Sequence, residues 1–402
     1  MEPETDEPEV SRPEAGARED ETEPVAPLSL LLLNPMGSDG WGGVERWLMD
    51  VALGLRDRGH HITSTGRPGS VWLQRCDDAG FPTVAVPLRA DFHLGQARKL
   101  SRFMLEHGVD VVATKLHRGI RVAGFAAKLA GAPPVTAFLG LVETRPGLRY
   151  RLTYDLFLDG VVTLSERMRA EIVERGALDP STVKAIPYGV RPEKYAPSET
   201  RRTEMRAALG LPPDAPMALA IGRLNDQKRF DLLLECFRDV RRSVPDAQLV
   251  IAGTGKLLPR LQDLRARLGL EQCAHLIGFR RDVAGLLSAC DSLVMSSDIE
   301  GLPMVVLETM ASARPVVATD VGSIDEQVVE GETGFLVPRR DMQALAKRLA
   351  QVLGDDALAR RMGAAGRERV LEHFPLDLCV RRTEAYLSGL RDAHPVSTSH
   401  AR

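Results

Sequence analysis

Short apolar runs alternate with longer amphipathic stretches along nearly the whole chain, and this alternation constrains the fold more than any other feature. The runs are rich in Val, Ile and Leu and show no polar face, as in LSLLLLN (28–34). In the stretch that follows, apolar residues recur at helical spacing, namely Trp47, Leu48, Val51 and Leu55. Strands buried on both faces are typical of parallel sheets covered by helices. We therefore predict an α/β fold.

Eleven further runs continue the pattern. They are HHITSTG (60–66), PTVAVPL (82–88), VDVVATKL (109–116), VVTLSE (161–166), VKAIPYGV (183–190), MALAIGRL (217–224), QLVIAGTG (248–255), AHLIGF (274–279), SLVMSS (292–297), RPVVATD (314–320) and GFLVP (334–338). A polar, proline-rich stretch, 195–216, divides the runs into two sets, and each set suits one doubly wound domain. We predict Rossmann-like domains at 28–194 and 217–372, joined by a linker at 195–216. Ligands bind beyond the carboxyl ends of such strands, so we expect the site in the cleft between the domains.

The two ends of the chain differ from this pattern. Residues 1–27 carry ten acidic and two basic side chains, and this net charge of −8 against −3 for the whole chain leaves about +5 for the rest. The segment has too few apolar residues to offset the entropy of ordering, so we expect a disordered acidic tail. It lacks the basic start and apolar core of a signal peptide. We expect a second disordered tail at 393–402.

Composition also narrows the cellular setting. Apolar residues make up 44% of the chain and charged residues 27%, which is ordinary for a globular protein, and no apolar run is long enough to span a bilayer. The five cysteines, Cys76, Cys236, Cys273, Cys290 and Cys379, are scattered and form no C-x-x-C pair. A disulfide framework or zinc site is therefore not expected, and a reducing cytoplasm is the natural location.

Arg223 and Lys228 lie five positions apart in GRLNDQKRFDLLLECF (222–237), where a strand leads into a helix. Two cations at such a junction can neutralise a diphosphate, because Arg offers a planar fork and Lys a point charge. A solvated basic turn would look the same. Spacing alone leaves both interpretations open.

Two glycine-rich loops also follow predicted strands. Gly253 and Gly255, in AGTGKLL, allow close backbone approach to a ligand, although a plain tight turn explains them equally well. Gly42 and Gly43, in MGSDGWGGVERW (36–47), precede a helix whose first amides could hold an anion or a sugar hydroxyl. Neither loop has the spacing of a dinucleotide fingerprint, so a flexible loop is the alternative for the second.

His117 follows a predicted strand of the first domain, where ligands gather, although a single His is often structural or merely exposed. Basic residues also cluster in this domain, at Arg98, Lys99 and Arg102 and again at Arg145, Arg149 and Arg151. They are consistent with attraction to an anionic membrane surface or to a phosphorylated lipid acceptor, or with ordinary solvated helix faces. No strongly apolar face accompanies them in the sequence.

Glu300 and Glu308 lie eight positions apart in SSDIEGLPMVVLETMA (296–311). Pro303 suits the first turn of a helix, and this places Glu308 inside an otherwise apolar helix. A buried carboxylate needs partners, and two vicinal ribose hydroxyls are one candidate. A helix cap at Glu300 and a structural hydrogen bond at Glu308 are the alternative, and the spacing does not decide between them.

Taken together, these segments resemble the retaining, nucleotide-sugar-dependent enzymes of glycosyltransferase family 4, which have the GT-B fold. The resemblance covers essentially residues 28–390 and is most specific in the second half. There, GRLNDQKRFDLLLECF, LVIAGTGKLL, LIGFRRDVAGLLSACDSLVMSSDIEGLPMVVLETMA, PVVATDVGSIDE and GETGFLVP occur in family order. The end of the chain is similar to the helices with which the family crosses back, so residues 373–392 are expected to pack on the first domain.

The resemblance implies a role for each matching residue. Arg223 and Lys228 would bind the donor diphosphate and stabilise the leaving group, and Glu308 would hold the ribose. The other roles are these: Glu300 with the backbone amides of Gly301, Leu302 and Pro303 on the transferred sugar, Gly278, Phe279 and Arg280 around the nucleobase, Gly42 and Gly43 near the diphosphate and acceptor, and His117 near the reacting carbon. The family is thought to react on the front face of the sugar, with the leaving phosphate helping to deprotonate the acceptor.

The resemblance also sets the expected partners. The donor would be a UDP- or GDP-linked sugar and the acceptor a glycan or glycolipid, in the synthesis of a cell-surface polysaccharide, lipopolysaccharide or glycolipid. The sequence has no Asp-x-Asp motif, and Arg223 and Lys228 supply positive charge instead, so no cofactor or metal is expected to be required. We expect a cytoplasmic enzyme, peripheral on the inner face of the membrane if the basic clusters act there, with no nucleic-acid partner.

Two alternatives share the same architecture. One is a nucleotide-sugar 2-epimerase, and the other is a non-catalytic GT-B subunit that only binds. The segment from Glu300 to Glu308 is intact after Gly222 and Arg223, which favours transfer over epimerisation. Degeneration would be expected to remove one of the four charged residues, yet Arg223, Lys228, Glu300 and Glu308 are all present. Tyr188, where the family more commonly has Asn, leaves the donor sugar undetermined.

Overall fold

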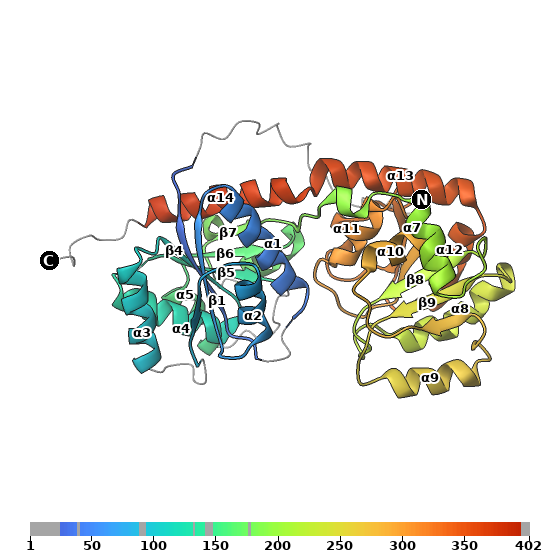
Figure 1. Cartoon of the computed structure of the whole chain (residues 1–402), viewed down its shortest axis with the longest axis horizontal. Coiled ribbons are helices and arrows are strands. Elements are labelled where there is room, and N and C mark those ends of the chain that lie inside the picture. The colour runs from blue at the N-terminus through green and yellow to red at the C-terminus, as the bar shows by residue number, and fades with distance from the viewer. Residues whose placement is uncertain are drawn as a thin grey trace, which may run out of the picture.

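The structure is a computed structural model that describes residues 25–37, 41–87, 94–131, 133–140, 148–175 and 178–394, without the side chains of residues 116–117 and 148–151. Most of the acidic tail at 1–27, nearly all of the segment 393–402, and Arg145 lie outside these residues. The side chains of His117, Arg149 and Arg151 lie outside them as well. Within the described residues the chain forms two α/β domains (Figure 1).

The N-terminal domain is a seven-stranded parallel sheet in the order β3-β2-β1-β4-β5-β6-β7. Its strands are β1 (Ser29–Asn34), β2 (His61–Gly66), β3 (Thr83–Ala85), β4 (Val111–Thr114), β5 (Val135–Leu139), β6 (Gly160–Thr163) and β7 (Val183–Ala185). Its helices are α1 (Gly43–Asp57), α2 (Val71–Asp78), α3 (Leu94–Glu106), α4 (Leu116–Leu129), α5 (Leu148–Phe157) and α6 (Glu166–Glu174). Every residue of β4 and β6 is buried, as expected for strands covered on both faces.

The C-terminal domain is a six-stranded parallel sheet in the order β10-β9-β8-β11-β12-β13. Its strands are β8 (Met217–Ile221), β9 (Gln248–Ala252), β10 (Ala274–Leu276), β11 (Ser292–Met295), β12 (Val316–Thr319) and β13 (Gly334–Val337). Its helices are α7 (Glu199–Ala208), α8 (Phe230–Ser243), α9 (Leu258–Arg267), α10 (Val283–Ala289), α11 (Met304–Ala311), α12 (Met342–Leu353) and α13 (Asp356–His373). The predicted fold class, two doubly wound Rossmann-like domains, is confirmed.

Two elements differ from the sequence prediction. Strand β5, in the interior of the first sheet, was not predicted, because Pro133 and Pro134 precede it and read as a break. The predicted linker 195–216 contains helix α7, which packs on α10 in the C-terminal domain. The polar composition of α7 conceals this packing, since its buried Arg206 pairs with Asp291 at 2.9 Å instead of contributing an apolar contact.

The chain crosses between the domains twice, and the two crossings are hydrogen-bonded to each other. The first crossing runs through Val190 and the short helix η2 (Pro192–Tyr195), and the second through Phe374 and Pro375. The Val190 N–H donates to Phe374 O at 3.0 Å, and the Leu376 N–H donates to Val190 O at 2.8 Å. Helix α14 (Leu376–Ala393) then packs on α1 of the N-terminal domain, while α13 lies over α11 of the C-terminal domain (Figure 1).

The strand orders locate the ligand-binding edge of each sheet. In the first sheet the order reverses between β1 and β4, and in the second between β8 and β11. Ligands bind to open α/β sheets in the crevice beyond the carboxyl ends of the strands at such a reversal. The loops that leave these four strands are therefore the ones most suited to hold a ligand.

Candidate active site

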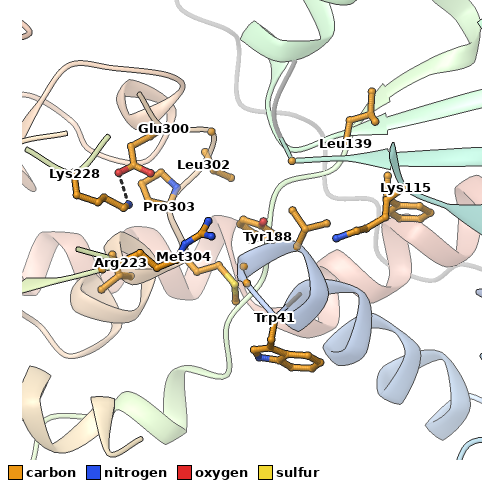
Figure 2. A pocket seen from close by; sticks show the side chains of 18 of the residues that line it. Trp41, Lys115, Leu139, Tyr188, Arg223, Lys228, Glu300, Leu302, Pro303 and Met304 are labelled. Carbon is orange, nitrogen blue, oxygen red and sulfur yellow. Dashed lines mark hydrogen bonds and ion pairs between the residues drawn. The ribbon is translucent and has the colours of Figure 1, made fainter. Parts of the chain in front are cut away.

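A pocket of about 520 Å³ lies between the domains and is lined by the loops that follow the four strands at the two reversals. The N-terminal domain contributes one wall, made of Trp41, Gly42, Gly43, Val44, Lys115, Phe138, Leu139, Gly140, Tyr154 and Tyr188. The C-terminal domain contributes the other wall, made of Gly222, Arg223, Lys228, Glu300, Gly301, Leu302, Pro303, Met304 and Val305. Figure 2 shows the charged side chains of the two walls facing the pocket from opposite sides. The expectation of a site in the cleft agrees with this geometry.

Three predicted residues meet on the C-terminal wall. Lys228 Nζ lies 2.5 Å from Glu300 Oε1 (Figure 2). The same oxygen accepts from Ser297 Oγ at 2.5 Å. The second carboxylate oxygen, Glu300 Oε2, and the Arg223 guanidinium have no partner within the described part of the chain. The wall therefore offers one uncompensated cation and one free carboxylate oxygen.

Asp298 ties the two loops of this wall together. Its backbone N–H donates to Gln227 O at 2.8 Å, and its carboxylate pairs with Arg229 at 3.2 Å and Arg340 at 2.8 Å. Hydrogen bonds from these guanidinium groups, that of Arg340 above all, hold the pKa of Asp298 well below its usual range although burial opposes them. The loop that carries Lys228 is thereby fixed beside the loop that carries Glu300.

Gly253 and Gly255 serve this wall from behind and do not line the pocket. Gly253 has a φ of +154°, and a Cβ there would lie 1.8 Å from Gly222 O. At Gly255 a Cβ would lie 2.3 Å from Leu224 O. Both glycines therefore let the loop after β9 pack against the loop that carries Arg223, which favours the tight-turn interpretation over direct contact with a ligand.

Helix α11 points its first turn into the pocket. Gly301, Leu302 and Pro303 form the turn before it, and Met304 and Val305 begin the helix. Pro303 has no backbone N–H, so the prediction that three amides donate here is wrong for Pro303. The amides of Gly301, Leu302, Met304 and Val305 have no backbone partner in the described residues and can donate to a ligand.

Glu308 does not line this pocket. It is 3% exposed and lies at the seam between the domains, where Oε1 pairs with Arg46 Nη1 at 2.6 Å and accepts from Tyr195 Oη at 2.8 Å. Arg46 also donates to Tyr195 Oη at 2.6 Å, which closes a triangle of contacts. Burial lowers the pKa of Arg46, but Glu308 and Tyr195 outweigh that effect and raise it overall. Oε2 of Glu308 has no partner within the described residues.

Lys115 and Glu45 form a buried ion pair beneath the N-terminal wall. Lys115 directly follows β4 and is the N-cap residue of α4. Glu45 lies in the first turn of α1, where its Oε2 accepts from the Gly42 N–H at 2.8 Å. Gly42 and Gly43, both predicted site residues, line the pocket at the start of α1. His117 is the second residue of α4, and its side chain lies outside the described residues.

The predicted nucleobase loop, Gly278 to Arg280, follows β10 and does not line the pocket. Gly278 O accepts from the Gly253 N–H at 2.8 Å, which attaches this loop to the one after β9. The Phe279 ring is 66% exposed, and Arg280 Nε donates to Asp282 Oδ1 at 2.8 Å. Phe279 is thus presented to solvent on a loop that is anchored behind the C-terminal wall through Gly253.

Sequence reasoning missed Lys115, Trp41, Tyr188, Arg46 and Tyr195 as members of the site or its seam. Lys115 could have been predicted from the sequence, because it lies at the end of a predicted strand, the same feature that selected His117. Tyr188 was noted only as a departure from the family pattern. Arg46 and Tyr195 carry no such signal, because their partner Glu308 is more than a hundred residues away.

The described residues contain neither a metal-binding cluster nor a membrane-spanning helix. No group of three or more His, Cys, Asp and Glu side chains there could hold a metal ion. No helix in the same residues is long and apolar enough to cross a membrane.

The chain matches two family models, one for each domain. Residues 41–194 match "Glycosyltransferase Family 4" and residues 201–369 match "Glycosyl transferases group 1". Among curated proteins it is 31% identical, over 74% of its own length and 81% of the relative, to a GDP-mannose-dependent alpha-(1-6)-phosphatidylinositol monomannoside mannosyltransferase of Mycolicibacterium smegmatis. It is 34% identical, over 72% of its length and 84% of the relative, to an alpha-maltose-1-phosphate synthase of Mycobacterium tuberculosis.

Solved structures share the architecture at lower identity. The structure of Anabaena Alr3699/HepE in complex with UDP superposes with a TM-score of 0.81 at 21% identity, over 90% of this chain and 100% of that one. The complex of the same protein with UDP-glucose gives a TM-score of 0.79 at 22% identity, with the same coverage. At these identities the likeness concerns the fold.

Proposed function

The chain belongs to glycosyltransferase family 4 and has the GT-B fold, and from this membership we propose how its cleft transfers a sugar from a nucleotide-diphosphate sugar to an acceptor hydroxyl. The chain is a glycosyltransferase, and the two relatives described above are likewise named as a transferase and a synthase. The comparisons lend no support to the alternatives of a 2-epimerase or a non-catalytic subunit. The donor wall, the stereochemistry and the acceptor are the proposed parts.

One observation carries the proposal: Arg223, Lys228 and Glu300 share the C-terminal wall of the pocket at the reversal of the strand order. Arg223 is an uncompensated cation there, and Lys228 has one ion-pair partner, Glu300 Oε1. A diphosphate bound at this wall would fill the donor capacity of both side chains. The negative charge that grows on the leaving phosphate would then be stabilised where it forms, which is the largest common source of enzymatic acceleration.

Each glutamate in our proposal uses one oxygen for the protein and one for the donor. Glu300 holds Lys228 and Ser297 through Oε1, so Oε2 is free to accept from hydroxyls of the transferred sugar. The amides of Gly301 and Leu302 donate to the same sugar. Glu308 holds Arg46 and Tyr195 through Oε1, which leaves Oε2 for the ribose diol. Because Glu308 lies behind the pocket lining, the ribose would reach it at the seam between the domains.

We propose retention of the anomeric configuration by front-face attack. Glu300 is the sole carboxylate among the described lining residues, and Lys228 holds one of its oxygens. The leaving phosphate, held by Arg223 and Lys228, is then the base available to the acceptor hydroxyl. These two cations also supply the charge that a divalent metal provides in other transferases, so the reaction is proposed to need no metal.

The donor nucleotide is proposed to be UDP or GDP. A relative is named as GDP-mannose-dependent, and a structural neighbour binds UDP-glucose. The backbone of Gly278, Phe279 and Arg280 would flank the base. Backbone contacts discriminate weakly between bases, so the sequence and the fold agree on a nucleoside diphosphate without fixing its base.

The acceptor is proposed to be a glycan or glycolipid at an anionic membrane surface in the cytoplasm. The exposed basic residues Arg98, Lys99 and Arg102 lie on α3, and the exposed Leu94 and Leu105 lie on the same helix. No apolar face beside these charges was expected from the sequence, yet the helical spacing of α3 places both leucines on the same face as Arg98 and Arg102. Basic and apolar side chains on one exposed face are typical of a helix that lies on a membrane.

A donor panel tests the function directly. Purified protein is incubated with UDP- and GDP-linked hexoses, with and without a membrane lipid extract, and the released nucleoside diphosphate is measured. We expect release from one class of donor, stimulated by the extract, and an NMR signal that shows the donor's anomeric configuration in the product. Inversion would contradict the front-face mechanism, and a product altered at C2 without acceptor would favour epimerisation.

A further inference from the structure

Lys115 is a buried ammonium with unfilled hydrogen-bonding capacity at the wall of the pocket. Its side chain is 7% exposed, and it lines the pocket from the carboxyl end of β4. Of its three N–H donors, one contact is present, to Glu45. Figure 2 shows the side chain extending from the N-terminal domain toward the middle of the pocket. A buried N–H group that makes no hydrogen bond costs free energy, so binding of a ligand oxygen at this point would be favoured.

Glu45 neutralises the charge of Lys115 but leaves its other N–H groups able to bind a ligand. Both oxygens of Glu45 are used inside the protein, Oε1 by Lys115 and Oε2 by the Gly42 N–H. Burial lowers the pKa of Lys115 to about 8, which still leaves it charged at neutral pH. The pair therefore adds donors to the wall but no net charge.

Tyr188 adds a second polar group to the same wall. It is 3% exposed, and Trp47 holds its ring edge-on at 5.3 Å between centroids. Its hydroxyl lies 3.6 Å from the position of a Cβ on Gly43 and has no partner within the described residues. Burial raises the pKa of Tyr188, so it remains a neutral hydroxyl that can both donate and accept. Val44 and Phe138 supply apolar surface around it.

We propose that Lys115 and Tyr188 contact the acceptor, and that this subsite selects an uncharged polyol ring over a ring that bears a phosphate. The inference rests on the proposed function, because the donor diphosphate occupies the opposite wall. The negative charge of that diphosphate already exceeds the positive charge of Arg223, the one uncompensated cation in the described lining. A second anion beside a neutral Lys115–Glu45 pair would therefore be repelled. A neutral ring satisfies the free N–H and O–H groups with its hydroxyls and covers the apolar surface with its C–H face.

The test uses matched acceptors that differ by one phosphate. Nucleoside diphosphate release from the accepted donor is followed with myo-inositol against myo-inositol 1-phosphate, and with methyl α-D-glucopyranoside against glucose 1-phosphate. We compare wild type with K115M/E45Q, E45Q and Y188F. The double variant removes both charges together, so no buried charge is left unpaired. R206M, which breaks a buried pair with Asp291 outside the pocket lining, controls for a general loss of stability.

In wild type we expect the lower KM for the neutral member of each pair. K115M/E45Q should raise that KM about tenfold or more, the size expected for a lost charged hydrogen bond, and Y188F should raise it severalfold. E45Q alone should lower the KM for the phosphorylated ring, because it leaves Lys115 as a free cation. R206M should lower the melting temperature and leave both KM values as in wild type.

Several results would overturn the subsite. These are a wild-type preference for the phosphorylated rings, no stimulation by either neutral ring, or an unchanged acceptor KM in both K115M/E45Q and Y188F. Donor binding, measured by calorimetry with UDP and GDP, separates the two proposals. If wild type binds neither nucleotide, the proposed function fails. If wild type binds one nucleotide as expected while the acceptor KM is unchanged in K115M/E45Q and Y188F, only the subsite proposal fails.

Discussion

Replacing each partner of the Arg46–Glu308 pair in turn should separate stability from nucleotide affinity. Arg46→Met should be the less stable variant, and Glu308→Gln should bind nucleotide more weakly. Arg46→Met leaves Glu308 almost fully buried, with Tyr195 as its remaining partner. Breaking a buried pair costs about 3–5 kcal/mol and an exposed pair at most about 1 kcal/mol. Arg46 is 34% exposed, so we place the cost between these limits, at about 2 kcal/mol. For one domain, a cooperative unit of about 150–250 residues, that corresponds to a melting temperature lowered by about 4–8 °C.

Glu308→Gln removes the buried charge itself, so the cost should be smaller, under about 1 kcal/mol. The amide oxygen can still accept from Tyr195, and Arg46 keeps its access to solvent. Nucleotide binding should show the reverse order. Loss of a charged acceptor for the ribose should weaken UDP or GDP binding about 10- to 100-fold in Glu308→Gln. Arg46→Met leaves Glu308 free for the ribose, so its affinity should match or exceed that of wild type.

Thermal melts and calorimetric titrations with UDP and GDP measure both quantities on the same samples. Tyr195→Phe is the matched control, since it removes one hydrogen bond to Glu308 and leaves the ion pair intact. The reasoning is refuted if Glu308→Gln lowers the melting temperature more than Arg46→Met and leaves nucleotide affinity unchanged. In that case Glu308 would be a structural residue of the seam.

Three further expectations follow from the structure. Asp298→Asn should be less stable than wild type near neutral pH. The gap should begin to narrow only below the unfolded pKa of Asp, about 4, and should close as the pH falls through the lower folded pKa, because a carboxyl with a lowered folded pKa stabilises above its unfolded pKa and loses that effect on protonation; urea unfolding at several pH values checks this, and a constant gap would contradict it. Transfer activity should be unchanged in EDTA, and a loss that Mg²⁺ restores would refute the paired-cation proposal. Glutamates at Arg98, Lys99 and Arg102 should abolish sedimentation with phosphatidylserine vesicles while a soluble acceptor is still used, and unchanged sedimentation would exclude α3 as the membrane face.

The sequence predicted the sheets better than the connections between the domains. Continuous Val, Ile and Leu runs identify parallel strands because burial on both faces requires them. Strand β5 escaped because two prolines precede it, and α7 because its contact with the core is the buried Arg206–Asp291 pair. Polar packing of this kind leaves no periodic signal in a polar segment.

The sequence likewise predicted the site residues that belong to one domain better than the contacts made between the domains. Glu300 joins Lys228 on one wall because both lie at strand ends of one domain, which a linear motif can predict. Glu308 meets Arg46 across the seam, a contact that depends on how two domains sit against each other and that no local spacing encodes. Lys115 followed the strand-end rule and was still missed, because His117 nearby matched the expected family pattern better.

The most direct test of the central claim is the turnover of Arg223→Met compared with that of Arg238→Met. Arg238 is an exposed arginine on α8, outside the pocket, and serves as the control. If the C-terminal wall stabilises the leaving diphosphate, Arg223→Met should lower kcat about 100- to 1,000-fold with a smaller change in donor affinity, and Arg238→Met should behave as wild type. Wild-type turnover in Arg223→Met would contradict the assignment of this wall to the donor.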